Sequence, residues 1–139
     1  MKLYPYYPKV LALGGVILMG IGFYFIFLRP PLLPEDARYM DTTVAEIQTA
    51  VPGLFRWLQK VFWVMGGYVF TSGLLMFYIA FSSFQARTRG AFPMIAFAGL
   101  SSIGWMTVVN FIIDSDFKWM LLAFVIVWAT ALILYRIEK

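Results

Sequence analysis

Four long segments of this chain, residues 10–28, 61–84, 91–113 and 119–135, contain no Asp, Glu, Lys, Arg or His. A helix rises about 1.5 Å per residue and the hydrocarbon core of a bilayer is about 30 Å thick, so each segment is about long enough to cross a membrane. The pattern predicts an all-α membrane protein: one domain, residues 1–139, folded as an antiparallel bundle of four transmembrane helices. The expected spans are about 10–28, 61–84, 91–113 and 117–135.

The composition removes most kinds of chemistry. The chain has no Cys and no His, which excludes disulfides, thiolate chemistry, zinc and iron–sulfur sites and histidine-bound haem. An ion path or proton relay would ordinarily place an ionisable residue within a span, and none is present. The net charge of +4 comes from Lys and Arg scattered singly at the span ends, whereas a nucleic-acid surface needs them clustered. We therefore expect a protein that is not an enzyme, has no cofactor and binds no nucleic acid.

The first apolar segment is expected to stay in the mature protein. Lys2 and Lys9 precede it, as in a secretory signal peptide. The hydrophobic region of such a peptide has about 7–15 residues, and this run has 19 before Arg29. It fits a signal anchor better.

The short flanks of the spans predict the orientation by the positive-inside rule. Three of them carry an excess of basic residues and belong on one side: Lys2, Lys9, Arg87, Arg89, Arg136 and Lys139. The loop 29–60 balances four basic residues with four acidic ones. Both termini are thus expected in the cytoplasm of a multi-pass protein, with the loop 29–60 outside.

The loop 29–60 has the sequence of a folded segment. Pro34, Glu35 and Asp36 are a favourable helix start, since proline loses no bonded N–H there and carboxylates stabilise the positive end of the helix dipole. Thr43 and Glu46 have the spacing of a capping box for a second short helix. After the break at 52–53, a helix is expected to continue directly into the second span. The loop should lie on the outer membrane face with its apolar side down.

Several short motifs give the chain a family resemblance. They are Leu33-Pro34-Glu35-Asp36, Trp57-Leu58, Val61-Phe62, Gly66-Gly67 and Gly73-Leu74-Leu75. Over residues 33–75 the chain resembles a group of small uncharacterised four-span bacterial inner-membrane proteins with a Leu-Pro-Glu-Asp loop motif after the first helix. The resemblance implies a four-span architecture and a bacterial inner-membrane location, and it implies no activity.

Small residues in the spans predict close helix packing, which is common in lipid. Gly67 and Thr71, and likewise Ala98 and Ser102, fit the small-xxx-small pattern. Packing within this bundle is the preferred interpretation of both pairs, and self-association is the alternative.

A group of polar residues is expected at the middle of the membrane, with Thr130 central in the last span: Thr71, Ser72, Ser101, Ser102 and Trp105. If these side chains face one another, they line a small cavity that hydrogen-bonds a lipophilic ligand. The stronger alternative is that the hydroxyls bond the carbonyl four residues earlier in their own helix, or join neighbouring helices.

The loops also contain acidic residues that could supply oxygen ligands for calcium or magnesium. They are Asp114 and Asp116 around Ser115, with Asn110, Glu35, Asp36, Asp41 and Glu46. The preferred interpretation is structural, because Asp and Ser are favoured in a tight turn before a helix. No metal site is predicted.

Two functions from different classes remain. The preferred one is a structural or accessory subunit that packs against a larger membrane complex, or against copies of itself, in the bilayer. Its expected contact residues are the aromatic side chains near the outer face: Trp57, Phe62, Trp63 and Trp119. The alternative is binding or transport of a lipophilic small molecule through the mid-membrane cavity.

Overall fold

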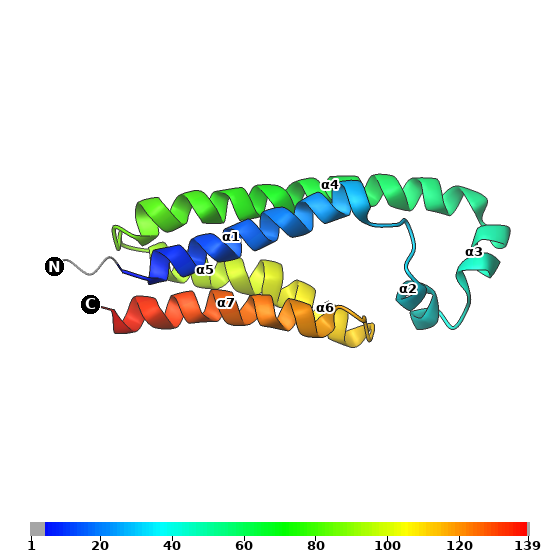
Figure 1. Cartoon of the computed structure of the whole chain (residues 1–139). Coiled ribbons are helices and arrows are strands. Elements are labelled where there is room, and N and C mark those ends of the chain that lie inside the picture. Colours follow the sequence, from blue (N-terminus) through cyan, green and yellow to red (C-terminus); the bar gives the residue numbers. More distant parts are fainter. Residues whose placement is uncertain (1–4, 139) are drawn as a thin grey trace.

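The chain forms an elongated bundle of helices, seen in a computed structural model that describes residues 5–138 (Figure 1). Its helices are α1 (Tyr7–Phe23), α2 (Pro34–Tyr39), α3 (Val44–Ala50), α4 (Pro52–Ile79), α5 (Ala91–Gly99), α6 (Trp105–Ile112) and α7 (Lys118–Ile137). Short π-helical segments extend α1 (Tyr24–Leu28) and α4 (Ala80–Phe84) and join α5 to α6 (Leu100–Gly104). No β-strand occurs within residues 5–138.

Four continuous helical stretches are long and apolar enough to cross a membrane: Tyr7–Leu28, Gly53–Phe84, Ala91–Ile112 and Lys118–Ile137. They run alternately in opposite directions, so that α2 and α3 lie at one end, which we call the loop end (Figure 1). The prediction of an all-α, four-span bundle is confirmed, and the chain is an integral membrane protein. The basic residues Lys2 and Lys139, which entered the orientation prediction, lie outside the described residues.

Three of the four helical stretches are longer than the uncharged segments that predicted them, and the third, Ala91–Ile112, is one residue shorter. The first begins at Tyr7 rather than residue 10, with Pro8 in its first turn, where a missing N–H costs nothing. The second begins at Pro52, nine residues before the expected span but at the break that predicted a continuous helix. The charged residues thus indicate the limits of the uncharged segment, whereas Pro8 and Pro52 indicate where the first two helices begin.

Four glycines bring the backbones of α1 and α4 into contact. A Cβ atom on Gly15 would lie 2.8 Å from the Gly73 carbonyl oxygen, and one on Gly73 would lie 2.6 Å from the Gly15 carbonyl oxygen. Gly22 and Gly66 form a second reciprocal pair, at 2.7 Å in each direction. The pairs are seven residues apart in both helices, which is about two turns, so they lie on the same face. This contact, which we call the glycine seam, fixes how α1 and α4 align.

The predicted small-xxx-small pairs do not form that contact. Nothing lies within 4 Å of a Cβ atom on Gly67, and Thr71 is exposed. Gly67 follows Gly66 by about 100° around the helix, which turns it away from α1. In the third span the Ser102 hydroxyl bonds the Ala98 carbonyl of its own helix at 2.6 Å. Gly67–Thr71 is therefore wrong as a seam between helices of this bundle, whereas packing at Ala98–Ser102 stays a prediction.

Helix α1 lies between α4 and α7 and packs against both, whereas α5 and α6 pack mainly against α7. Trp128 of α7 joins α5, because its indole lies against Gly99 and its Nε1–H donates to the Ile95 carbonyl oxygen at 3.2 Å. The face of α4 that points away from α1 remains largely uncovered by α5, α6 and α7.

The end of the bundle opposite α2 and α3 is closed by aromatic rings. Tyr7 packs edge-on against Phe84 and Tyr135, with centroid distances of 5.4 and 5.2 Å. The Arg87 guanidinium lies 4.8 Å from the Tyr7 ring centroid and 4.5 Å from that of Tyr135. The Glu138 carboxylate accepts the Tyr7 backbone N–H at 3.3 Å, which places a negative charge at the positive end of α1. These contacts join α1, α4 and α7.

Candidate functional site

The contacts that hold the loop 29–60 begin at the first turn of α2. Asp36 Oδ2 accepts the Leu33 backbone N–H at 2.9 Å and forms an ion pair with Arg29 at 3.0 Å. The helix start predicted at Pro34 is confirmed. A helix of six residues is not stable by itself in water, so contacts with the rest of the bundle must hold it in place.

Arg29 connects that helix to the end of α4. Its guanidinium lies 3.6 Å from the Phe62 ring centroid and 5.5 Å from that of Phe25, and its side chain is only 8% exposed. A cation on an aromatic face contributes about 2 kcal/mol when it is desolvated. Arg29 thus has both an anion and an aromatic face as partners, and it links α1, α2 and α4.

A buried polar pair fixes α2 to the turn between α6 and α7. The Ser115 hydroxyl donates to Glu35 Oε1 at 2.8 Å and accepts the Phe117 backbone N–H at 3.1 Å. Glu35 is 4% exposed and Ser115 is 1% exposed. The residues are 80 positions apart. From the sequence, Glu35 was considered for the helix dipole and as a cation ligand, and Ser115 for a turn. Nothing local in the sequence indicates this pairing.

Charged contacts surround this buried pair. Arg38 donates to Asp116 at 3.1 Å and to the Asp114 carbonyl oxygen at 3.2 Å. Lys118 pairs with the Asp114 carboxylate and lowers the pKa of that carboxyl below its ordinary value. Exposed ion pairs contribute about 0–1 kcal/mol, so the Glu35–Ser115 bond has the larger part in positioning α2. We call these α2-to-turn contacts the loop latch.

The second loop helix forms as predicted but does not dock. The Thr43 hydroxyl accepts the Glu46 N–H at 3.2 Å and Glu46 Oε2 accepts the Thr43 N–H at 3.1 Å, which confirms the capping box. The Thr42 hydroxyl bond, and then the Thr43 bonds, lower the pKa of Glu46. Helix α3 has no buried residue. Helix α2 therefore holds the loop to the bundle, mainly by polar contacts, and the expectation that the loop lies apolar side down on the membrane stays a prediction.

The acidic residues considered as calcium or magnesium ligands are distributed among separate partners. Asp36 pairs with Arg29, Asp114 with Lys118 and Asp116 with Arg38. Asp114 also has a positive φ of 54°, a conformation that Asp tolerates in turns. Among residues 5–138, no three Asp, Glu, His or Cys side chains lie close enough together to hold a metal ion.

Three of the four expected contact aromatics are exposed near the loop end. Trp57 is 62% exposed and Trp119 is 66% exposed, and Trp63 is also exposed with the Lys60 ammonium 3.5 Å from its ring centroid. Phe62 differs, since it is only partly exposed and lies beneath Arg29. The structure places Trp57 and Trp63 on α4 and Trp119 at the start of α7.

The expected mid-membrane polar group does not come together. Ser72, Ser101 and Thr130 each bond the carbonyl four residues earlier in their own helix, at 2.8, 2.9 and 2.7 Å. Thr71 and Trp105 are exposed on the outside of the bundle.

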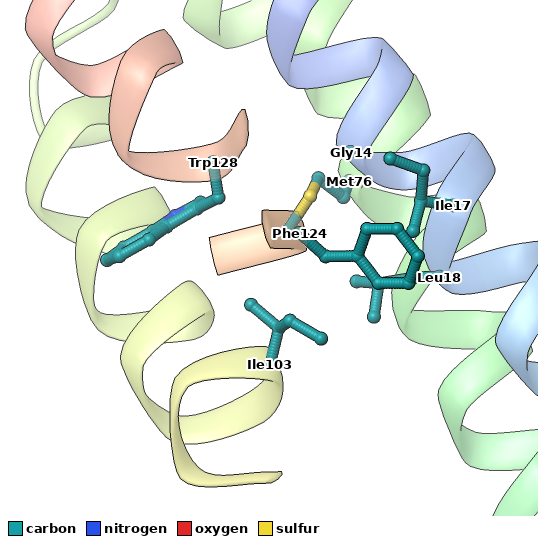
Figure 2. Close-up of a pocket in the computed structure, with 7 residues that line it drawn as sticks. All are labelled: Gly14, Ile17, Leu18, Met76, Ile103, Phe124 and Trp128. Atoms are coloured by element: carbon teal, nitrogen blue, oxygen red, sulfur yellow. The ribbon is translucent and has the colours of Figure 1, made fainter. Parts of the chain in front are cut away.

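The space between the helices at that depth is apolar (Figure 2). Side chains from α1, α4, α7 and the third span surround it: Gly14, Ile17, Leu18, Met76, Ile103, Phe124 and Trp128. Its volume is about 10 Å³, about enough for one water molecule. None of the five predicted ligand residues lines it.

Comparison with protein-family models, curated proteins and solved structures finds no match to this chain.

Proposed function

We propose that this protein is a non-catalytic accessory subunit of a larger assembly in the bacterial inner membrane. Both termini lie in the cytoplasm and the loop end lies outside. The subunit contributes through contact, and its contact surface consists of Trp57, Trp63 and Trp119 at the loop end.

The exposed part of α4 beyond the membrane boundary carries this proposal. The glycine seam aligns Leu28 with Lys60, because each lies six residues from the Gly22–Gly66 pair. The eight residues 52–59 therefore extend about 12 Å beyond the end of the first span. Trp57 lies on this extension, and the rest of the described chain leaves it 62% exposed. A large aromatic exposed in such a place is a typical anchor of a protein interface.

The chemistry of the chain supports a role without catalysis. The loop latch is a polar cluster outside the spans, in which Arg38 pairs with Asp116 and Lys118 pairs with Asp114. Catalysis requires a nucleophile with a base, a metal, or acids held out of water near a substrate pocket. The side chains of the latch serve the fold instead.

Removal of the exposed indoles tests the proposal. A Trp57→Ala, Trp63→Ala double variant should insert normally but lose at least one stoichiometric partner when the protein is purified in mild detergent. Phe97→Ala is the matched control, since Phe97 is 70% exposed on α5 and lies away from the loop end. Equal partner recovery from the double variant and wild type, or purification of a lone wild-type protein, contradicts the proposal.

Binding of a lipophilic molecule within the bundle has less support. The space in Figure 2 is much smaller than such a ligand, and the polar side chains expected to hold one bond their own helices.

A further inference from the structure

A shallow depression, open along most of its boundary, lies on the uncovered face of α4, and we call it the groove. It is lined by residues of that helix alone: Lys60, Val61, Val64, Met65, Tyr68 and Val69. From Lys60 to Val69 the helix rises by about 13 Å. The groove therefore has a cation at one end and an apolar wall over more than two helical turns.

The glycine seam sets the depth of this groove in the bilayer. Lys60 is level with Leu28, the last residue of the first span, and Arg29 follows at once. The ammonium group therefore lies at the boundary between hydrocarbon and lipid headgroups. The apolar wall, from Val61 to Val69, extends from that boundary into the hydrocarbon.

The charge at the groove entrance lacks an anion. Lys60 holds its ammonium 3.5 Å from the Trp63 ring centroid, and neither Lys60 nor Arg56, one turn away, forms an ion pair with a carboxylate among residues 5–138. The other basic residues at this end, Arg29, Arg38 and Lys118, each form an ion pair with a carboxylate. Lys60 and Arg56 thus form an uncompensated positive site at headgroup depth.

We propose that this groove binds one anionic glycerophospholipid. Its phosphate contacts Lys60, with Arg56 adding to the positive potential, and one acyl chain lies along Val61, Val64 and Val69. Both parts of the groove are complementary to this ligand. The negative phosphate is attracted to the Lys60 ammonium, and the acyl chain packs against the apolar side chains of the groove. The site adjoins the proposed partner surface, since the Lys60 ammonium lies on the Trp63 ring, but its test measures lipid retention and requires no partner.

Native mass spectrometry of the full-length protein tests this site. The protein is released from detergent micelles that contain equal amounts of phosphatidylglycerol and phosphatidylcholine with the same acyl chains. Wild type should retain phosphatidylglycerol in preference by about fivefold, the ratio expected for one basic residue near an anionic lipid. Lys60→Gln should abolish the preference, and Val64→Trp should fill the groove and reduce retention of both lipids.

Two variants serve as controls. Arg89→Gln removes an exposed cation at the opposite end and should keep the preference, and Tyr68→Phe preserves the wall of the groove and should also keep it. Melting temperatures in detergent verify that each variant is folded. Equal retention of both lipids by wild type would show annular lipid only and overturn the proposal. An unchanged preference in folded Lys60→Gln overturns it too, as does a wild-type dimer that Val64→Trp dissociates.

Discussion

The buried hydrogen bond between Ser115 and Glu35 holds α2 against the turn between α6 and α7. The Ser115 hydroxyl serves two partners, the Glu35 carboxylate and the Phe117 N–H. Because both side chains are out of water, loss of the hydroxyl leaves a buried acceptor without its donor, which costs about 1–3 kcal/mol. The Ser115 hydroxyl, in a turn 80 residues away, is therefore the main contact that positions α2.

We expect Ser115→Ala to release α2 without unfolding the spans. Amide exchange at residues 35–39 should become faster by about one order of magnitude or more, in line with that cost. Ser72→Ala is the control, since Ser72 only bonds its own helix on the exposed face of α4. If α2 exchanges at the wild-type rate in Ser115→Ala, the Glu35–Ser115 bond does not hold it.

The Thr43–Glu46 capping box should make α3 sensitive to acid. Its hydrogen bonds hold the pKa of Glu46 below the ordinary 4.5. A lowered pKa in the folded state stabilises α3 above pH 4.5, and this stabilisation is lost as the pH falls through the folded value. Amide exchange in 44–50, corrected for its intrinsic pH dependence, should report progressively less protection as the pH falls below 4.5. Glu46→Gln should remove this change, and a pH-dependence that survives in Glu46→Gln would assign it to another group.

At the scale of elements, the glycine seam differs from ordinary side-chain packing. At Gly15, Gly22, Gly66 and Gly73 the atoms nearest to an added Cβ belong mainly to the opposing backbone. A side chain can rotate away from a new methyl group, whereas a helix backbone can only move as a whole. The two helices therefore tolerate no enlargement along this line.

Gly73→Ala should accordingly destabilise the protein by about 1–3 kcal/mol or more, the usual cost of overpacking. Gly67→Ala provides a matched control on the same helix, because nothing lies within 4 Å of its added Cβ. It should be neutral or stabilise α4 slightly, since Ala has the higher helix propensity. Thermal unfolding in one detergent compares the two variants. Equal melting temperatures for Gly73→Ala and wild type would contradict the backbone contact.

At the scale of the whole molecule, α1 holds two helical hairpins together. One consists of α1 and α4, the other of the third span and α7, and the loop latch and the aromatic rings tie them at opposite ends. The latch thus lies on the side of the membrane that faces away from Arg87. The orientation of the molecule in the membrane therefore determines whether the loop latch or the aromatic rings lie on the cytoplasmic side.

Single cysteines in this cysteine-free chain test the orientation. Ala45→Cys and Asp116→Cys, both exposed at the loop end, should react with an impermeant thiol reagent in intact cells. Thr88→Cys, exposed at the opposite end, should react only after the cells are lysed. Asp116 is chosen rather than its neighbour Ser115, because Ser115 is buried and a cysteine there would be inaccessible to the reagent. Labelling of Thr88→Cys but not Ala45→Cys in intact cells would invert the orientation.

The sequence predicts those features that depend on neighbours along the chain. Length and charge located the spans, Pro34 and the Thr43–Glu46 spacing located two helix starts, and all of these are local rules. The Glu35–Ser115 bond could not be found in this way, because it depends on how two hairpins align in space. The glycine spacing was visible but ambiguous: Gly66 and Gly67 are equivalent in sequence, and only the rotation of α4 selects Gly66.

The position of the glycine seam along the chain also gives the molecule an order of assembly. Every residue of the seam lies within the first 73 positions, so the tightest helix pair is complete before α5 has been synthesised. That pair can close as the ribosome continues, as N-terminal units commonly do. Glu35 then has no Ser115 hydroxyl to bond until the last hairpin has been synthesised. The last hairpin then packs against the completed α1–α4 pair, and the Ser115 hydroxyl of its turn bonds Glu35 of α2.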